Sequence, residues 1–284
     1  MAEGLVIHVL AAVRIQSLPE FRTNLSKDSQ LKLTFVTDEK EARETLADAQ
    51  RLTDVFVVDN DLGGVFELVK ELRQMYPRLL IILVDQEADF GMPGHADEVS
   101  VTPFENDDLL KRIKRLNEER SLQTLRADAL PPVRAFAKSL RRAGAGPAKM
   151  QAAVEAIKEL GYDYVAFYNM VPTTPPEMRL SSQIGPSSLL SIAPQQQDYQ
   201  NSLVGWVTQN GQSRIIGPED LLNHPFVKQQ RFNSGVCVPV GTTLRFGVIF
   251  ACREQPNAIT QQNVMMLELV SAQLASALAK QARS

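Results

Sequence analysis

The sequence predicts two domains of different class: an α/β domain with a parallel sheet, and then an α+β domain with an antiparallel sheet. In the first 104 residues, short apolar runs alternate with segments of helical periodicity, the order typical of a buried parallel sheet. In residues 131–284, alternating strands are enclosed by helices at both ends. The length of 284 residues also fits two domains of about 100–200 residues each.

The first domain is predicted to alternate five strands with three helices before a connecting helix. The strands are expected at residues 4–11, 31–36, 54–62, 79–84 and 98–101. Capping boxes that begin at Ser17 and Asp38 predict helices at about 17–25 and 38–49, and a third helix at 64–76 ends before Pro77. Residues 86–95 contain two Gly and one Pro, so any helix there is expected to be broken.

Residues 105–130 predict one charged helix that connects the two domains. Its apolar residues recur on one face of a 3.6-residue period: Leu109, Leu110, Ile113, Leu116 and, more sparsely, Leu122 and Leu125. Asn106 and the two acids after it suit a helix N-terminus, and two prolines at 131–132 end the helix. Two interpretations stay open: a solvated connector, or a helix that packs against its twin in a homodimer.

The second domain begins with two helices, at residues 133–142 and 148–160. Residues 185–200 are rich in Gly, Pro, Ser and Gln and are expected to be irregular. A further helix is expected at 201–208, and a final helix runs from about 260 to 282. The predicted strands are residues 164–171, 178–184, 213–216, 235–240 and 244–253.

The third strand runs into acids in the segment DVFVVDNDLGG, which contains Asp59, and the fifth lies in ADEVSVTPF, residues 96–104. With the order and lengths of the other elements, these segments resemble the receiver domain of two-component response regulators over residues 4–122. The resemblance implies a flavodoxin-like sheet of five parallel strands in the order 2-1-3-4-5. It also implies that Asp59 stands at the phosphoacceptor position, at the carboxyl end of the strands where ligands bind in such sheets.

Three of the four signature positions depart from the receiver pattern. The acidic pair that ends the first strand in the family is replaced by Ala11 and Ala12. The fourth strand ends in Asp85 instead of Ser or Thr, and Thr102 stands where the family has Lys.

These departures remove the groups that phosphoryl transfer requires, because the reaction depends on a metal ion and on cations over the phosphoryl oxygens. Asp59, with Asp61 and Asp85 near it, would repel an incoming phosphoryl group. We therefore predict a pseudo-receiver, a protein-binding or dimerising module without metal or catalysis, and phosphorylation of Asp59 is the alternative. The three carboxylates are otherwise interpreted as solvated acids at strand ends.

Four segments of the second half resemble a GAF domain, the small-molecule-sensing fold of many signalling proteins, over residues 133–282. They are SLVGWVTQNGQSRII (202–216), SGVCVPVG (234–241), LRFGVIFACRE (244–254) and AITQQNVMMLELVSAQLASALAKQ (258–281). The resemblance implies an antiparallel sheet with a pocket on one face and the terminal helices on the other, and parallel dimers through those helices. The expected organisation is a pseudo-receiver at 1–104, a connector at 105–130 and a GAF domain at 131–284.

The last helix has more apolar surface than one sheet face obviously needs. Its stripe consists of Val264, Leu267, Val270, Leu274 and Leu278, widened by Met265, Met266 and Leu269. Either all of it packs on the sheet, or part of it pairs with a second chain together with residues 133–142 and the connector.

The sequence predicts no cofactor and no metal site. Attachment of a bilin, one of the ligands of GAF relatives, needs a Cys that usually lies beside a His, and neither Cys237 nor Cys252 has an adjacent His, while His224 has no neighbouring Cys. A tight turn at 241–242 would pair Cys237 with about Phe246, which places the two cysteines about 20 Å apart along the strands. A disulfide needs Cα atoms within about 7 Å, so both are interpreted as buried apolar cysteines.

The prediction for function is a non-enzymatic signalling adaptor in the cytoplasm that acts through protein–protein contacts, as a homodimer and with an unidentified signalling partner. A net charge of −3 gives no argument for nucleic acid, and no apolar run approaches the length of a membrane span. The alternatives are a phosphorylatable response regulator that uses Asp59 and a GAF small-molecule sensor that controls a separate output protein. A thiol-dependent catalytic GAF domain and a DNA-binding regulator are weaker alternatives.

Overall fold

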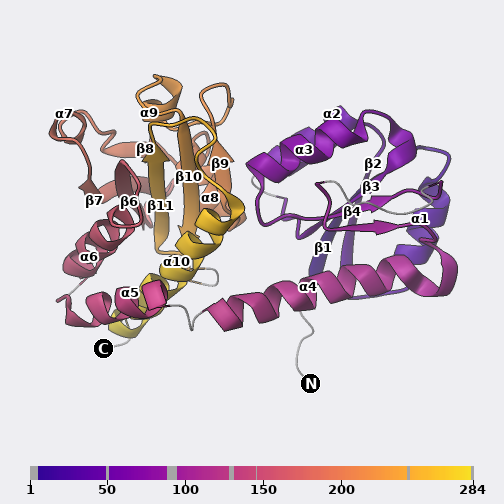
Figure 1. Ribbon diagram of the computed structural model, residues 1–284, viewed down its shortest axis with the longest axis horizontal. Helices are drawn as coiled ribbons and strands as arrows, with labels where there is room; N and C mark the ends of the chain where they lie inside the picture. Colours follow the sequence, from indigo (N-terminus) through magenta and orange to yellow (C-terminus); the bar gives the residue numbers. More distant parts are fainter. Residues whose placement is uncertain are drawn as a thin grey trace. The chain divides into compact units, whose positions relative to one another are not determined.

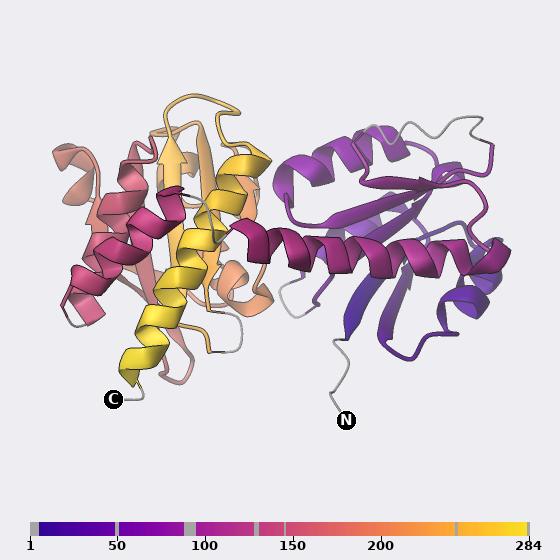
Figure 2. The same cartoon turned by 60° about the horizontal axis from the view of Figure 1, so that its bottom comes forward.

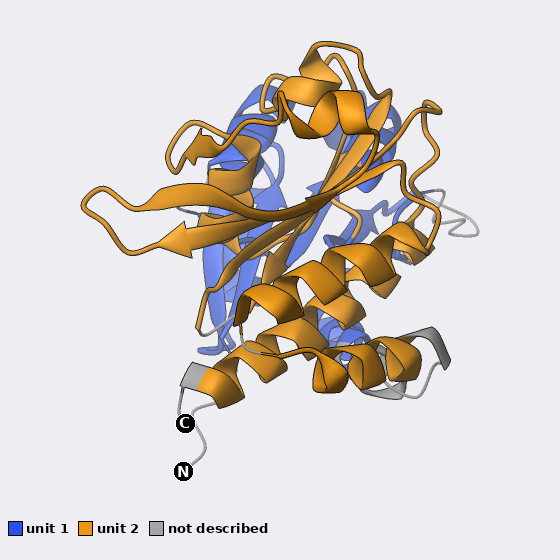
Figure 3. Ribbon diagram, turned by 90° about the vertical axis from the view of Figure 1, so that its left-hand side faces the viewer, with its two compact units in different colours: residues 1–74, 78–123 blue, residues 75–77, 124–284 orange. Residues whose placement is uncertain are grey.

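The computed structural model describes residues 6–48, 51–87, 95–127, 131–144, 146–241 and 244–282. The chain forms two compact units, residues 1–74 with 78–123 and residues 75–77 with 124–284 (Figure 3). Each unit contains one sheet. No helix in the described ranges is long and apolar enough to cross a membrane.

The first unit contains a parallel sheet with strand order β2-β1-β3-β4-β5 (Figure 1). Its strands are β1 (Ile7–Ala12), β2 (Leu31–Val36), β3 (Val55–Asp59), β4 (Leu80–Val84) and β5 (Glu98–Ser100). The strand order predicted for this half is confirmed. All five residues of β3 are buried, as expected for the central strand of a sheet that is covered on both faces.

The helices of the first unit are α1 (Leu18–Leu25), α2 (Glu39–Ala47), α3 (Val65–Met75) and α4 (Asp108–Ala127), with short 3₁₀ turns η1 (Asn60–Leu62) and η2 (Glu105–Asp107). In Figure 1, α2 and α3 lie on one side of the strands and α4 on the other. Asp38 caps α2 as predicted, since its Oδ1 accepts a hydrogen bond from the amide of Glu41 at 2.8 Å. The capping box predicted at Ser17 is wrong, because that side chain makes no capping hydrogen bond.

Helix α4 runs along the sheet of the first unit (Figure 2). Its apolar stripe is buried in the core of that unit, in a cluster with residues of β1, β3 and β4. Leu109 and Ile113 are completely covered, and Leu110 and Leu116 are each 8% exposed. On the polar side, Arg112 Nη1 lies 2.8 Å from Glu98 Oε2 at the start of β5. Both interpretations of these four residues, a solvated connector and a dimer seam, are therefore wrong. The side chains of Leu122 and Leu125 lie outside the described residues.

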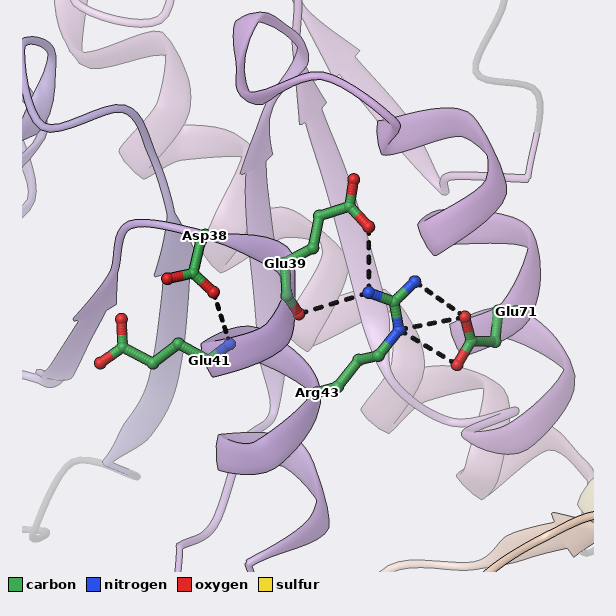
Figure 4. Close-up of polar contacts among 5 residues, drawn as sticks. All are labelled: Asp38, Glu39, Glu41, Arg43 and Glu71. Carbon is green, nitrogen blue, oxygen red and sulfur yellow. Dashed lines mark hydrogen bonds and ion pairs between the residues drawn. The ribbon is translucent and has the colours of Figure 1, made fainter.

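An ion-pair network joins α2 to α3 (Figure 4). Arg43 Nη2 lies 2.9 Å from Glu71 Oε2 and its Nη1 lies 2.9 Å from Glu39 Oε2. The hydrogen bonds to Glu71 raise the pKa of Arg43 above its usual value. Because all three side chains are partly exposed, we expect the network to contribute at most about 1 kcal/mol to stability.

The second unit contains an antiparallel sheet with strand order β8-β7-β6-β11-β10-β9. Its strands are β6 (Tyr164–Val171), β7 (Glu177–Ile184), β8 (Gln196–Asp198), β9 (Arg214–Ile216), β10 (Ser234–Val240) and β11 (Gly247–Arg253). The predicted α+β class is confirmed. Within 185–200, which was predicted to be irregular, the structure has β8 and a one-turn helix, α7 (Ser187–Leu190).

Three long helices cover one face of this sheet: α5 (Pro131–Arg142), α6 (Gly146–Lys158) and α10 (Gln261–Ala282) (Figure 3). The other helices are α8 (Leu203–Asn210) and α9 (Pro225–Lys228), and α9 was not predicted. The stripe of α10 is buried in a cluster with α5, α6 and the sheet. Its extra apolar surface is covered in part by α5, since Val133 packs with Leu269, Met265 and Met266.

The register between β10 and β11 differs from the prediction. Cys237 pairs with Phe250 rather than with Phe246, because the connection is a six-residue loop between the paired residues Val240 and Gly247 instead of a tight turn. Cys252 lies two residues beyond Phe250 on the same sheet face, so the two cysteines are diagonal neighbours, typically about 7–8 Å apart. The predicted separation of about 20 Å is wrong, whereas the prediction that both are buried is confirmed.

Candidate functional site

The first candidate site lies at the carboxyl edge of the parallel sheet, where Asp59 is the last residue of β3. The side chain of Asp59 is only 8% exposed, and its Oδ1 accepts a hydrogen bond from the amide of Asp61 at 3.1 Å. Asp61 lies in η1, the short turn that follows the strand directly. Gly63 and Gly64 then take φ values of +83° and +63°, which glycine adopts most readily, and lead into α3.

A cation reaches this edge from the loop after β1. Arg14 forms an ion pair with Asp61 through Nη2, and its Nε lies 3.9 Å from Asp59 Oδ2. Inspection of the sequence missed Arg14, because it looked for cations only at the lysine position of the family. The rule used for the acids would have found it, since Arg14 lies two residues after the end of β1.

The remaining predicted residues surround Asp59 without forming one constellation. Ala11 and Ala12 end β1 and are buried, so they add no polar group to the edge. Asp85 follows β4, and its carboxylate accepts hydrogen bonds from Asn60 Nδ2 and from the amide of Glu87, each at 3.2 Å. Thr102 is exposed in the connection after β5.

The chemistry available at this edge is that of a carboxylate pair held by one guanidinium. Arg14 gives Asp59 and Asp61 a positive charge partner. Among the described residues, no group of three or more His, Cys, Asp or Glu is arranged to hold a metal ion. The edge therefore combines an acceptor-like aspartate with a cation, Arg14, from the described part of the chain.

The second candidate site is the face of the GAF-like sheet opposite the three long helices. Six aromatic side chains, which we call the aromatic layer, meet there and are at most 2% exposed: Tyr164, Tyr168, His224, Phe226, Phe232 and Phe250. The first two and the last come from β6 and β11, and the other three come from α9 and its flanking loops. Ring centroids of neighbouring members lie 3.8–6.3 Å apart.

His224 is the polar centre of the aromatic layer. Its Nδ1 accepts a hydrogen bond from the amide of Phe226 at 3.2 Å, so Nε2 carries the proton and donates to Tyr168 Oη at 2.9 Å. The imidazole stacks on Phe250 with a centroid distance of 3.8 Å. Burial lowers the pKa of His224 to about 3 and raises the pKa of Tyr168 above its usual value. Both groups are therefore neutral near pH 7.

The two cysteines lie on the same face of the sheet. Burial raises the pKa of Cys237 and of Cys252 well above the ordinary thiol value. The thiolate is the reactive form of cysteine, so neither group is activated for nucleophilic attack. The sequence predicted that both cysteines are buried, but it did not predict that His224 lies on this face, because α9 was not predicted.

The fold and the composition of this face can be compared with known proteins. Residues 149–279 match the model of the GAF domain family. This segment is a GAF domain. The GAF domain supports a signalling or sensor role for the protein. The comparison with curated proteins found no match.

Several solved structures resemble the GAF domain. The free methionine-R-sulfoxide reductase from Neisseria meningitidis is 17% identical, with a TM-score of 0.47, over 53% of this chain and 88% of that one. The GAF domain of the Acinetobacter phosphoenolpyruvate-protein phosphotransferase is 18% identical, with a TM-score of 0.43, over 54% of this chain and 93% of that one. The chromophore-binding domain of the bacteriophytochrome RpBphP3 from R. palustris is 14% identical, with a TM-score of 0.44, over 54% and 61% of the two chains.

Proposed function

We propose that the protein is a non-enzymatic signal-transduction adaptor in which a degenerate receiver domain and a GAF domain act through contacts with other proteins. The observation that carries the proposal is the pairing of Arg14 with Asp61 beside Asp59. The charge partner of these carboxylates is a guanidinium from the protein itself, whereas a phosphorylatable site would need a metal ion and a lysine. The receiver-like unit would then present one constant surface to a partner.

The GAF domain contributes to this proposal through its aromatic layer. This face of the sheet is covered by aromatic side chains of the GAF domain itself. A ligand on this face would have to displace rings that pack against each other. The unreactive thiols of Cys237 and Cys252 argue against a catalytic role that uses cysteine. A scaffold that binds partners needs neither an open pocket on this face nor an activated nucleophile.

One observation favours a second function, that of a phosphorylatable regulator. Asp59 ends the central strand, and Arg14 is a cation that could offset part of the charge of a phosphoryl group. The two functions differ in whether Asp59 becomes phosphorylated.

We expect that acetyl phosphate with Mg²⁺ leaves the intact mass of the full-length protein unchanged, because the carboxylates that would hold the metal ion are replaced by Ala11 and Ala12. Intact-mass spectrometry after incubation measures this directly. The matched variants are Asp59→Asn and Asp61→Asn, which remove one carboxylate each. An added phosphoryl mass that disappears in Asp59→Asn and persists in Asp61→Asn would establish phosphorylation and overturn the adaptor proposal.

We also propose that the protein is a homodimer that uses the outer side of α5 and the N-terminal half of α10. Met265 and Met266 remain partly exposed there after Val133 has packed against them. We expect native mass spectrometry to give twice the mass of the 31.5 kDa chain, and Met266→Glu to shift the population towards the monomer. The control is Gln229→Glu, which introduces the same side chain at an exposed position after α9, on neither of these two helices. A monomeric natural protein at micromolar concentration would refute the dimer.

A further inference from the structure

The helical side of the GAF domain contains a groove that none of the functions above uses. It lies between the C-terminal halves of α5 and α10 and the N-terminus of α6, and it has a volume of about 460 Å³. Its apolar lining comes from Ala137, Leu140 and Ala277, and glutamine and serine side chains of α10 supply hydrogen-bonding groups. This volume is in the range of small-molecule sites, about 300–1,000 Å³.

Three cations line the groove: Arg141 from α5, Lys149 from α6 and Lys280 from α10. They come from helices that are separate in the sequence and converge only in the folded domain. Among the described residues, no carboxylate lies within 4.0 Å of the Arg141 guanidinium or the Lys149 ammonium, and Lys149 Nζ donates to the carbonyl of Gly144 at 2.9 Å. That hydrogen bond places the ammonium beside Gly144, which lies between α5 and α6.

The surrounding sequence is basic without interruption. Residues 129–154 contain five Lys or Arg and no Asp or Glu. The charge is also segregated along the chain: residues 1–123 contain 15 Lys and Arg against 23 Asp and Glu, whereas residues 124–284 contain 15 against 10. The net charge of −3 for the whole protein therefore conceals a positive region around this groove.

Neutralisation of helix dipoles does not account for all three cations. Arg141 and Lys280 stand near helix C-termini, where a positive charge is favourable. Lys149 is the fourth residue of α6, close to a helix N-terminus, where a positive charge is unfavourable. The positive charge of Lys149 beside the groove is therefore not explained by the dipole of its own helix.

We propose that this groove binds a phosphorylated small molecule of nucleotide size, with its phosphates between Arg141, Lys149 and Lys280 and its apolar part over Ala137 and Leu140. Two or more phosphate charges suit three cations, and charge-assisted hydrogen bonds to phosphate oxygens are the strong class of such contacts. The site is on the opposite side of the sheet from the aromatic layer. The inference does not depend on the adaptor proposal, since it concerns only the helical side of the GAF domain.

The test is isothermal titration calorimetry of the full-length protein with ADP, without added metal, and with adenosine and inorganic pyrophosphate as comparison probes. We expect ADP to bind, pyrophosphate to bind more weakly because it lacks the apolar part, and adenosine to show no heat. Arg141→Gln and Lys149→Gln should each weaken ADP binding about tenfold, since each removes one charged hydrogen bond of about 1.5 kcal/mol. The matched control is Lys138→Gln, a change at an exposed lysine of α5 outside the groove lining, which should leave the affinity unchanged.

Several results would overturn the inference. These are the absence of ADP binding at millimolar concentration, ADP binding that both groove variants retain, and adenosine binding as tight as that of ADP. Size-exclusion chromatography with light scattering on the same variants provides a further check. If Arg141→Gln or Lys149→Gln changes the mass of the particle, the groove is an interface between copies of the chain and not a ligand site.

Discussion

Replacing Ile113 with aspartate is expected to unfold the first unit, with a loss of about 4 kcal/mol or more in its free energy of unfolding. Ile113 is completely buried in the cluster that α4 forms with β1, β3 and β4. The substitution removes a large apolar side chain and places a carboxylate among the apolar side chains of this cluster. Hydrogen exchange measured by mass spectrometry should show lost protection in β1 and β3.

The matched control is Lys111→Asp, which introduces the same side chain at an exposed position two residues earlier in the helix. We expect it to change the stability by no more than about 0.5 kcal/mol, as is usual for exposed substitutions. If Ile113→Asp instead converted a dimer to a monomer and left β1 and β3 protected, α4 would be a dimerisation helix and its packing on the sheet would be refuted.

Acid is expected to destabilise the GAF domain through His224. Burial lowers the pKa of this group in the folded protein to about 3, whereas its ordinary value is 6.5. Below pH 6.5 the unfolded chain binds a proton that the folded domain does not, so stability is complete above pH 6.5 and falls until about pH 3. At 1.36 kcal/mol per pKa unit, the loss across this window is about 5 kcal/mol.

The measurement is urea unfolding of the full-length protein at several pH values between 7 and 4. Carboxylates also contribute to acid unfolding, so the contribution of His224 is isolated by comparison with His224→Asn, which does not titrate. We expect this variant to be less stable at pH 7, because it loses the hydrogen bond to Tyr168, but to lose stability more slowly as the pH falls. The control is His95→Asn, the same substitution at an exposed histidine of the first unit. Equal slopes for His224→Asn and the natural protein would show that the buried imidazole is not held neutral.

Element order was predictable because it depends on periodicity along the chain. The strand order of the first sheet and the antiparallel class of the second came instead from the resemblances to the receiver and GAF families, and both are confirmed. The errors occurred where a neighbour distant in sequence decides the outcome. The stripe of α4 was visible in the sequence, but its partner on β1, β3 and β4 was not, so the helix was interpreted as either a solvated connector or a dimer helix. The β10–β11 register failed because loop length, not strand pattern, sets it.

For the candidate sites too, some features follow from the sequence alone and others only from the tertiary structure. The sequence alone determined that Asp59 ends a buried strand, that Ala11, Ala12 and Thr102 lack the groups of a phosphoryl-transfer site, and that residues 129–154 are basic. These are properties of residue identity and local spacing. Only the tertiary structure decided that Arg14 lies beside Asp59 and Asp61, that His224 enters the aromatic layer, and that Arg141, Lys149 and Lys280 line one groove. Each of these pairs or clusters joins separate elements, and the packing of the two domain cores, rather than any local preference, brings those elements together.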